Sequence, residues 1–169
     1  ADIYVVALHD ASLGSLEKIN GLKNKFVVHT AGSVSKDVLK NISSTYGILY
    51  PLQTLTKITE QIPQIPFLVE GNNKEALHQI TEFARTLSNK VIPVNETERL
   101  HYHIAAVFAG NFTNHMYAIA ESFCEKENID FKNLLPLVNE VTSKVNNNSP
   151  HDVQKGQDMR EDIFTINRN

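Results

Sequence analysis

The N-terminal half of the chain alternates short, continuously apolar runs with polar or amphipathic segments. Runs of this length, rich in Val, Ile, Leu and Phe, predict strands that are buried on both faces of a sheet. The predicted strands are residues 3–8, 25–29, 47–49, 67–69 and 91–94. The connections between them are all longer than a hairpin turn, as crossovers between parallel strands require. The pattern therefore predicts an α/β fold with a mainly parallel sheet and helices on its faces.

Three of these connections carry helical signals. Residues 12–22 are polar and amphipathic, and residues 74–87 place apolar side chains at every third or fourth position, the period of a helix with one covered face. Between the second and third strands, Ser33 or Ser35 is suited to cap a helix. A short hydroxyl side chain at that position accepts a hydrogen bond from the free amides of the first turn.

The pattern becomes purely helical from residue 95 onward. Residues 96–126 lack proline and carry apolar side chains on almost every side, which predicts one long and largely buried helix. Another helix begins at Asp130 or Asn133, and the later start is favoured because it places Pro136 in the first turn. A turn at 146–150 precedes a last amphipathic stretch at 159–166.

Two domains are therefore expected, a sheet domain over residues 1–94 and an all-helical domain over residues 95–169. A small helical domain with so apolar a central helix needs a surface to cover it. We expect it to pack against the sheet domain or against a second copy of the chain, which predicts a homodimer.

Composition and charge narrow the class of protein. The chain has 169 residues, 41% of them hydrophobic, and a net charge of −3 without any block of basic residues. Neither nucleic acid nor an anionic membrane surface is favoured as a partner. Cys124 is the only cysteine, and neither a secretory leader nor a membrane-spanning apolar run is present. A cytoplasmic protein fits these features best.

Polar residues follow three of the predicted strands at their carboxyl ends. Parallel strands bring these ends to one edge of the sheet, where ligands collect, so we expect the three turns to line one crevice. The residues expected to bind a ligand there are His9, Asp10, His29, Thr30, Gly32, Ser33, Pro51 and Gln53. The structural alternative is that Gly32 only makes a turn, Ser33 only caps a helix and His29 is hydrogen-bonded inside the core.

The long helix carries one polar stripe. At about 100° per residue, His103 and Asn114 lie roughly 20° apart, and Asn111 lies about 80° from His103. Buried imidazole and amide groups need partners, which are either a substrate or structural groups of the first domain or of a partner chain. His101 and His103 do not suggest a metal site, because residues two apart on a helix point in nearly opposite directions.

Four separated motifs together resemble a known family. Residues 28–34 (VHTAGSV), 47–54 (GILYPLQT), 103–111 (HIAAVFAGN) and 154–162 (QKGQDMRED) are similar, in the same order, to the bacterial Rossmann-like proteins that carry a C-terminal domain of unknown function. These proteins are described as NADP oxidoreductases. The resemblance implies a nucleotide-binding N-terminal domain and a helical, dimerising C-terminal domain, like those of 6-phosphogluconate dehydrogenase and pyrroline-5-carboxylate reductase.

The chain also departs from that family. The family's first strand and its G-x-G-x-x-G/A turn are absent, and Ala1 to Ile3 resemble the fourth strand of its sheet, so we expect the sequence to start inside the nucleotide-binding domain. In the related hydroxyacid dehydrogenases a lysine four residues before the helix asparagine acts as acid and base. That position here is Val107, so lysine chemistry is not carried over.

The leading hypothesis is an oxidoreductase that uses NADP, or NAD, on an unknown small polar substrate. His103 and Asn111 are then the catalytic residues, because they would hydrogen-bond the reacting oxygen and because histidine is a suitable proton donor near neutral pH. The alternative is a dimeric nucleotide-binding or sensing module that keeps the scaffold without the reaction. Val107 and the lack of a recognisable catalytic dyad or triad favour that alternative.

Overall fold

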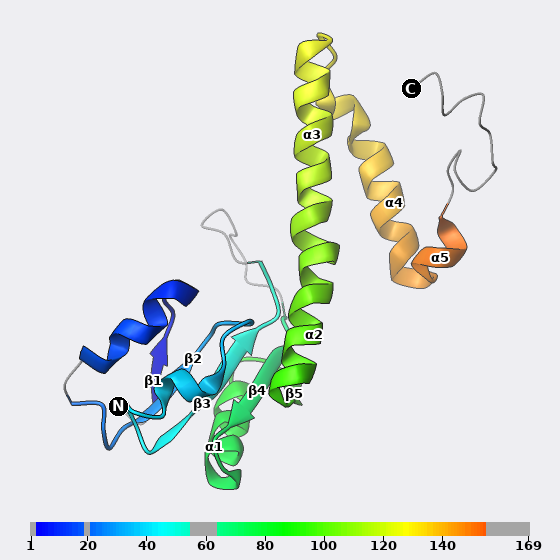
Figure 1. The fold of residues 1–169 in the computed structure, drawn as a ribbon. Helices are drawn as coiled ribbons and strands as arrows, with labels where there is room; N and C mark the ends of the chain where they lie inside the picture. The colour runs from blue at the N-terminus through cyan, green and yellow to red at the C-terminus, as the bar shows by residue number, and fades with distance from the viewer. Residues whose placement is uncertain (1–2, 19–20, 55–63, 155–169) are drawn as a thin grey trace. The chain divides into compact units, whose positions relative to one another are not determined.

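The computed structural model describes residues 3–18, 21–54 and 64–154 (Figure 1). The chain forms two compact units, residues 1–115 and residues 116–169. The first unit contains the whole sheet and the first helices after it. The division falls inside the helical region, and the predicted boundary at residue 94 stays a prediction.

Unit one is built on a five-stranded sheet with strand order β1-β2-β3-β4-β5. The strands are β1 (Ile3–Val6), β2 (Phe26–His29), β3 (Thr45–Pro51), β4 (Phe67–Gly71) and β5 (Val91–Pro93). β1, β2 and β3 are parallel, β4 is antiparallel to β3, and β5 is parallel to β4. The predicted α/β fold with a mainly parallel sheet is confirmed. The carboxyl ends of β1, β2 and β3 share one edge, whereas those of β4 and β5 lie at the other.

The sheet is covered on both faces, and the side-chain alternation of β2 shows how. Phe26 and Val28 belong to a core cluster with Ile80 of α1 (Lys74–Arg85), while Val27 between them packs in a second cluster with Leu39. Successive side chains of a strand point to opposite faces, so α1 covers one face and the segments around Leu39 cover the other. This two-sided burial is the reason for the continuous apolar runs in the sequence.

The antiparallel register of β3 and β4 brings two polar side chains to the same face. Ile48 lies opposite Glu70 and Tyr50 lies opposite Leu68. Because residues two apart on a strand share a face, Tyr50 and Glu70 both point away from the α1 side. Ile48 and Leu68 between them are fully buried.

The connections on that second face are short 3₁₀ helices. η1 (Asp10–Lys18) occupies most of the predicted amphipathic segment, and η2 (Lys36–Leu39) follows β2. Ser35, not Ser33, caps η2, and its hydroxyl oxygen accepts a hydrogen bond from the backbone N–H of Asp37. The expectation of a hydroxyl cap at this helix start is confirmed for Ser35.

The long helical segment begins with a strong N-terminal signal. Asn95 caps α2 (Glu96–Ala106) by a capping box, in which its side chain accepts from the N–H of Glu98 and the Glu98 carboxylate accepts from the N–H of Asn95. A π-helical turn, η3 (Val107–Phe112), follows, and then α3 (Thr113–Lys126). Helix therefore runs over the predicted range 96–126, but with a wider turn in its middle.

Beyond α3, the chain continues as η4 (Phe131–Leu134), α4 (Leu135–Asn147) and the short α5 (Pro150–Val153). Pro136 lies in the first turn of α4, as the later helix start predicts, and Asp130 caps η4. The predicted amphipathic stretch 159–166 and most of the motif 154–162 lie outside the described residues.

The prediction that the long helix is largely buried is wrong for the single chain. Many apolar side chains of α2, η3 and α3 are exposed, among them Tyr102, Ile104, Phe108, Phe112, Met116, Ile119 and Phe123. This helical segment carries more apolar side chains than the contacts within one chain can bury. Across the described ranges, no helix is long and apolar enough to cross a membrane.

Candidate functional site

A tyrosine and a histidine meet where β3 ends. The hydroxyl of Tyr50 lies 3.0 Å from Nδ1 of His103, and the two rings pack edge to face with their centroids 5.8 Å apart. Tyr50 comes from the carboxyl-end part of β3, and His103 comes from α2. Burial raises the pKa of Tyr50 above its ordinary value of 10.0, so the phenol stays protonated at neutral pH.

Gly32 lies directly against this pair. A Cβ atom at Gly32 would come within 2.5 Å of His103 Nδ1 and 2.7 Å of Tyr50 Cζ, closer than real Cβ contacts. Only glycine therefore allows the turn after β2 to pack on the two rings. Gly32 was predicted to bind a ligand; its backbone packs against the Tyr50–His103 pair, and the binding role stays a prediction.

The Tyr50–His103 pair forms part of the wall of a cavity of about 490 Å³. Its lining residues come from the turn after β3, from α2 and from the π-helical turn: Tyr50, Leu52, Gln53, Thr54, His103, Ala106, Val107, Ala109, Gly110 and Asn111. Apolar and small side chains make much of the wall. The hydroxyl, imidazole and amide groups provide hydrogen-bond donors and acceptors for a small polar molecule.

The π-helical turn explains why Asn111 shares the cavity with His103. Hydrogen bonds from residue i to i+5 widen such a turn, so each residue advances less around the axis than in an α-helix. Asn111 is thereby rotated back toward the side of His103, while Asn114, predicted to be in phase, is not among the lining residues. Gly110 faces the cavity too, because a Cβ there would meet only Thr54 Oγ1 at 3.7 Å.

A buried charge cluster is bonded to the Gly32 backbone, which packs on the Tyr50–His103 pair. Arg99 of α2 is fully buried, its Nη1 donates a hydrogen bond to the carbonyl oxygen of Gly32, and its Nε lies 3.5 Å from Glu70 Oε2. Glu70 also accepts a hydrogen bond from Lys36 Nζ at 2.7 Å. Hydrogen bonding to this carboxylate raises the pKa of Lys36 above its ordinary value of 10.5. The guanidinium thus links α2, β4 and the turn after β2.

His29 is held within the same turn. Its Nδ1 accepts a hydrogen bond from the N–H of Ala31, and its Nε2 lies 3.2 Å from the carbonyl oxygen of Ser35. Since Nδ1 accepts from an N–H, the ring proton must be on Nε2, which donates to Ser35. Burial, as the largest cause, lowers the pKa of His29 below 6.5, although the Ser35 bond opposes the shift. His29 is a neutral, fully buried connection within the turn.

Comparison with known proteins identifies the family. The family model of a domain of unknown function, DUF2520, matches residues 65–169. The chain belongs to the DUF2520 family. The Rossmann-like resemblance expected from the four motifs is confirmed. No curated protein sequence matches the chain.

Solved structures resemble this DUF2520 chain over nearly its whole length. A "putative NADP oxidoreductase" from Bacteroides fragilis is 37% identical with a TM-score of 0.91, and the match covers 99% of this chain and 66% of that one. Protein TM1727 from Thermotoga maritima is 21% identical with a TM-score of 0.81, over 99% and 69% of the two chains. The pyrroline carboxylate reductase of Plasmodium falciparum, solved with NADP bound, is 17% identical with a TM-score of 0.53, over 96% and 63%. The last two likenesses show the fold alone.

The predicted ligand-binding residues of the DUF2520 chain divide into two groups. Gln53 lines the cavity together with His103 and Asn111. The others follow strand ends at the same edge of the sheet but are not on its wall: His9, Asp10, His29, Thr30, Gly32, Ser33 and Pro51. Their binding roles stay predictions.

Two of that second group are engaged with each other at the surface. The exposed Ser33 hydroxyl donates a hydrogen bond to Asp10 Oδ2 at 2.6 Å, which ties the turn after β2 to the start of η1. Close by, the N–H of Thr30 donates to the carbonyl oxygen of Val6 at the end of β1. These contacts show that the first two strand ends do meet, as parallel pairing predicts.

Three residues of the site carried too weak a signal to be chosen from the sequence. Tyr50 stood in the turn motif but not among the selected residues, and its hydroxyl proves to be the partner of His103. Arg99 and Glu70 look like ordinary charged positions, which are mostly exposed in proteins. The one available signal was the spacing of Arg99, four residues before His103 and therefore on the same helical face.

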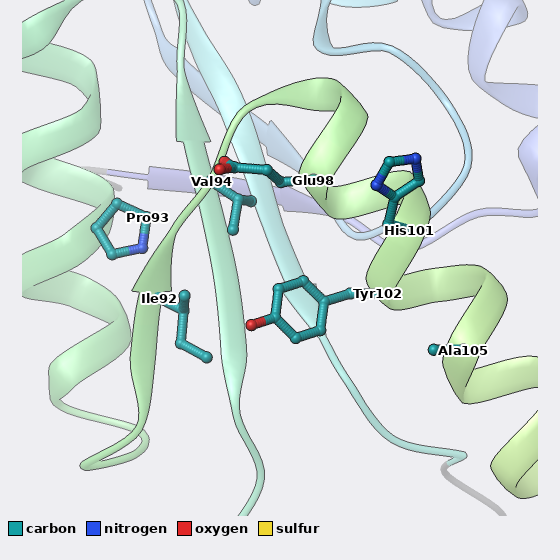
Figure 2. Close-up of a pocket in the computed structure, with 7 residues that line it drawn as sticks. All are labelled: Ile92, Pro93, Val94, Glu98, His101, Tyr102 and Ala105. Atoms are coloured by element: carbon teal, nitrogen blue, oxygen red, sulfur yellow. The ribbon is translucent and has the colours of Figure 1, made fainter.

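A second cavity, of about 510 Å³, lies on another side of α2 (Figure 2). Ile92, Pro93 and Val94 line one side of it. From α2, Tyr102 projects toward Ile92, and His101 lines the cavity from the same helix. His101 and His103 thus line different cavities, as their spacing of two predicts. In the described part of the chain, no three His, Cys, Asp or Glu side chains gather closely enough to hold a metal ion.

Proposed function

We propose that the complete protein is an NADP-dependent oxidoreductase that acts on a small polar substrate in the cavity beside Tyr50 and His103. The single observation that carries this proposal is the Tyr50–His103 hydrogen bond on the wall of a cavity at the sheet edge where Rossmann-like folds bind ligands. The name of the Bacteroides fragilis protein supports it, as does the NADP bound to the Plasmodium falciparum reductase.

The residues of the cavity fit the nicotinamide end of the cofactor. Gln53, Thr54 and Asn111 offer amide and hydroxyl groups that match a carboxamide and a ribose, and the small side chains beside them leave room for a flat ring. The 169 residues contain no G-x-G-x-x-G turn for the pyrophosphate. A nicotinamide held by these residues would supply or accept the hydride exchanged with the substrate carbon.

The Tyr50–His103 pair would manage the proton that accompanies the hydride. As general acid, His103 would start protonated on both ring nitrogens, with Nδ1–H donating to the Tyr50 oxygen, and would deliver its Nε2 proton to the oxygen or nitrogen of the reduced group. The imidazole is then neutral and regains a proton from solvent. Asn111 orients that group through its amide. The raised pKa of Tyr50 keeps the phenol protonated, so the hydrogen bond to His103 persists across the neutral range.

A homodimer is the proposed state of the protein. Large apolar side chains are exposed on the helices of each unit, including Phe108 and Phe112 in unit one and Met116 and Phe123 in unit two. Exposed apolar surface of this kind is typical of a protein–protein interface. We propose that a second copy of the chain covers these exposed apolar side chains.

One observation favours the alternative of a non-catalytic nucleotide-binding module. Val107 lines the cavity, so an apolar side chain stands where related dehydrogenases carry a catalytic lysine. A module of this kind would bind NADPH and change its state without turnover. In that case the Tyr50–His103 pair would be a structural contact.

The full-length protein separates these functions. NADPH binding is measured by calorimetry, and NADPH oxidation is then followed with a panel of small keto acids and cyclic imino acids. The proposed function predicts saturable binding and turnover of at least one panel member. In His103→Ala, kcat should fall by at least about a hundredfold, as expected when a general acid is lost. His78→Ala is the matched control, because His78 is exposed on α1, away from the cavity.

Each other outcome has a definite meaning. Binding without oxidation of any panel member favours the non-catalytic module. Absence of NADPH binding contradicts both functions. Unchanged kcat in His103→Ala and Asn111→Ala, with turnover in the unmodified protein, would remove His103 of α2 and Asn111 of η3 from the mechanism.

A further inference from the structure

Arg99 sits on the same face of α2 as His103, four residues earlier in the chain. Side chains at this spacing are neighbours on a helix surface. His103 meets Tyr50 of β3, and Arg99 meets Glu70 of β4. Tyr50 and Glu70 in turn share one face of the sheet. One helix face thus makes two polar contacts with one sheet face.

Arg99 also holds the turn that packs on the two rings. Its Nη1 donates to the carbonyl oxygen of Gly32 and lies 3.5 Å from that of Ala31. Gly32 is the residue at which an added Cβ would collide with His103 and Tyr50. Any displacement of the Gly32 backbone is therefore transmitted directly to the aromatic pair.

Stability alone does not account for this arginine. Its side chain is 1% exposed, and neither Nε nor Nη2 has a hydrogen-bond partner among the described residues, so Nε meets Glu70 as an ion pair only. A buried ion pair loses its hydration and often contributes no more to stability than an apolar pair of similar volume. The geometry, by contrast, needs a guanidinium, because only its planar fork reaches a carboxylate and two carbonyl oxygens at once.

We propose that Arg99 is a positioning residue, which fixes the Gly32 turn against α2 and so sets the hydrogen bond between Tyr50 and His103. Glu70 compensates the charge of the guanidinium through the ion pair with Nε. The kinetic consequence rests on the proposed oxidoreductase function. The geometric consequence does not, since the Tyr50–His103 bond exists with or without turnover.

The test uses Arg99→Lys in the full-length protein. Lysine keeps the positive charge for Glu70 but has a single ammonium group, which cannot also reach the two carbonyl oxygens. We expect the imidazole nitrogen signals of His103 in heteronuclear NMR to shift toward those of a histidine without the Tyr50 bond. We expect kcat to fall about a hundredfold while the Kd for NADPH changes little, as for a small misplacement of reacting groups.

Arg85→Lys is the matched control, because Arg85 is an exposed arginine at the end of α1 paired only with Glu82 in the described structure. It should leave the His103 signals, kcat and Kd unchanged. If Arg99→Lys does not fold, Glu70→Gln takes its place. That variant keeps the volume and an acceptor, and we expect a shift of the His103 signals in the same direction with a smaller loss of kcat.

The outcomes separate this proposal from the proposed function. His103 signals that stay unchanged in a folded Arg99→Lys protein, or in Glu70→Gln, overturn the positioning role. Shifted signals in a protein that never oxidises NADPH keep the positioning role and reject the oxidoreductase. Shifted signals with unchanged kcat reject any catalytic consequence of the position that Arg99 sets.

Discussion

The turns after β2 and β3 end at the same edge of the sheet but are built in different ways. Buried groups hold the β2 turn: His29 connects Ala31 to Ser35, and Arg99 holds Gly32. The turn after β3 is fixed mainly by local bonds, from Gln53 N–H to the Pro51 carbonyl and from Thr54 N–H to the Gln53 side chain. Only the second turn lines the cavity.

This difference teaches how to interpret polar residues at strand ends. A histidine at the end of a buried strand either binds a ligand or satisfies its own turn, and the sequence is the same in both cases. Here His29 is fully buried and both ring nitrogens are engaged by backbone groups, whereas Gln53 is exposed on the cavity wall. The β2 turn is a scaffold turn, held by buried groups, and the β3 turn lines the cavity.

The largest effect is expected from Gly32→Ala, which breaks the scaffold turn itself. The added methyl group collides with His103 and Tyr50 and must push the rings or the turn aside. Overpacking of this kind costs about 1–3 kcal/mol of unfolding free energy. The loss of the ring pair should lower NADPH oxidation about a hundredfold. Urea unfolding and steady-state kinetics measure the two effects.

Gly14→Ala is the control for that substitution. Gly14 lies in η1, and a Cβ there would meet no atom within 4 Å. Its unfolding free energy should change by no more than about 0.5 kcal/mol. Equal effects of the two substitutions would show that the contact at Gly32 has no special importance.

An intermediate effect is expected from His29→Leu, which removes the internal connection of the scaffold turn. The N–H of Ala31 and the carbonyl of Ser35 lose their partner in a buried place, at a cost of about 1–3 kcal/mol. Binding of NADPH by the folded variant should change little, because His29 does not line the cavity. A large loss of NADPH affinity without a loss of stability would show instead that His29 contacts the cofactor.

The same histidine predicts a pH dependence with a definite sign. His29 has a lowered pKa when folded, so below its ordinary value of 6.5 the unfolded chain binds more protons than the folded one. His29 therefore contributes its full share of the free energy of unfolding above pH 6.5. That share decreases as the pH falls below 6.5. Urea unfolding over this pH range should therefore show a steeper loss in the unmodified protein than in His29→Leu.

The smallest effect is expected from Gly110→Ala on the cavity wall. The new methyl group would lie 3.7 Å from Thr54 Oγ1, an ordinary contact, so the fold should persist. The cavity becomes narrower, and KM should rise up to about tenfold for bulky substrates and less for small ones. Uniform KM values across a series of substrate sizes would mean that Gly110 does not face the substrate.

The sequence predicted the elements of the fold well and their directions less well. Continuous apolar runs identified all five strands. The signal is clearest for β2 and β4, which are buried on both faces of the sheet. The antiparallel direction of β4 could not be predicted, since a connection of that length allows either direction. The segment 55–63 of that connection lies outside the described residues.

The candidate site was predicted in part. His103 and Asn111 were found from their polar character on an apolar helix, and both line the cavity with Gln53. Asn114 was placed in phase with His103 because a regular helix was assumed, and the π-helical turn changes the phase after Val107. Arg99 was not found, because its spacing of four residues from His103 was the one signal and a charged residue on a helix is usually exposed.

The most direct measurement is a crystal structure of the full-length protein with NADP⁺. The oxidoreductase mechanism predicts that the nicotinamide ring lies in the cavity between Gln53 and Asn111, with the Tyr50–His103 hydrogen bond intact beside it. A nicotinamide ring bound away from this cavity, with Tyr50 and His103 still in contact, would contradict the mechanism.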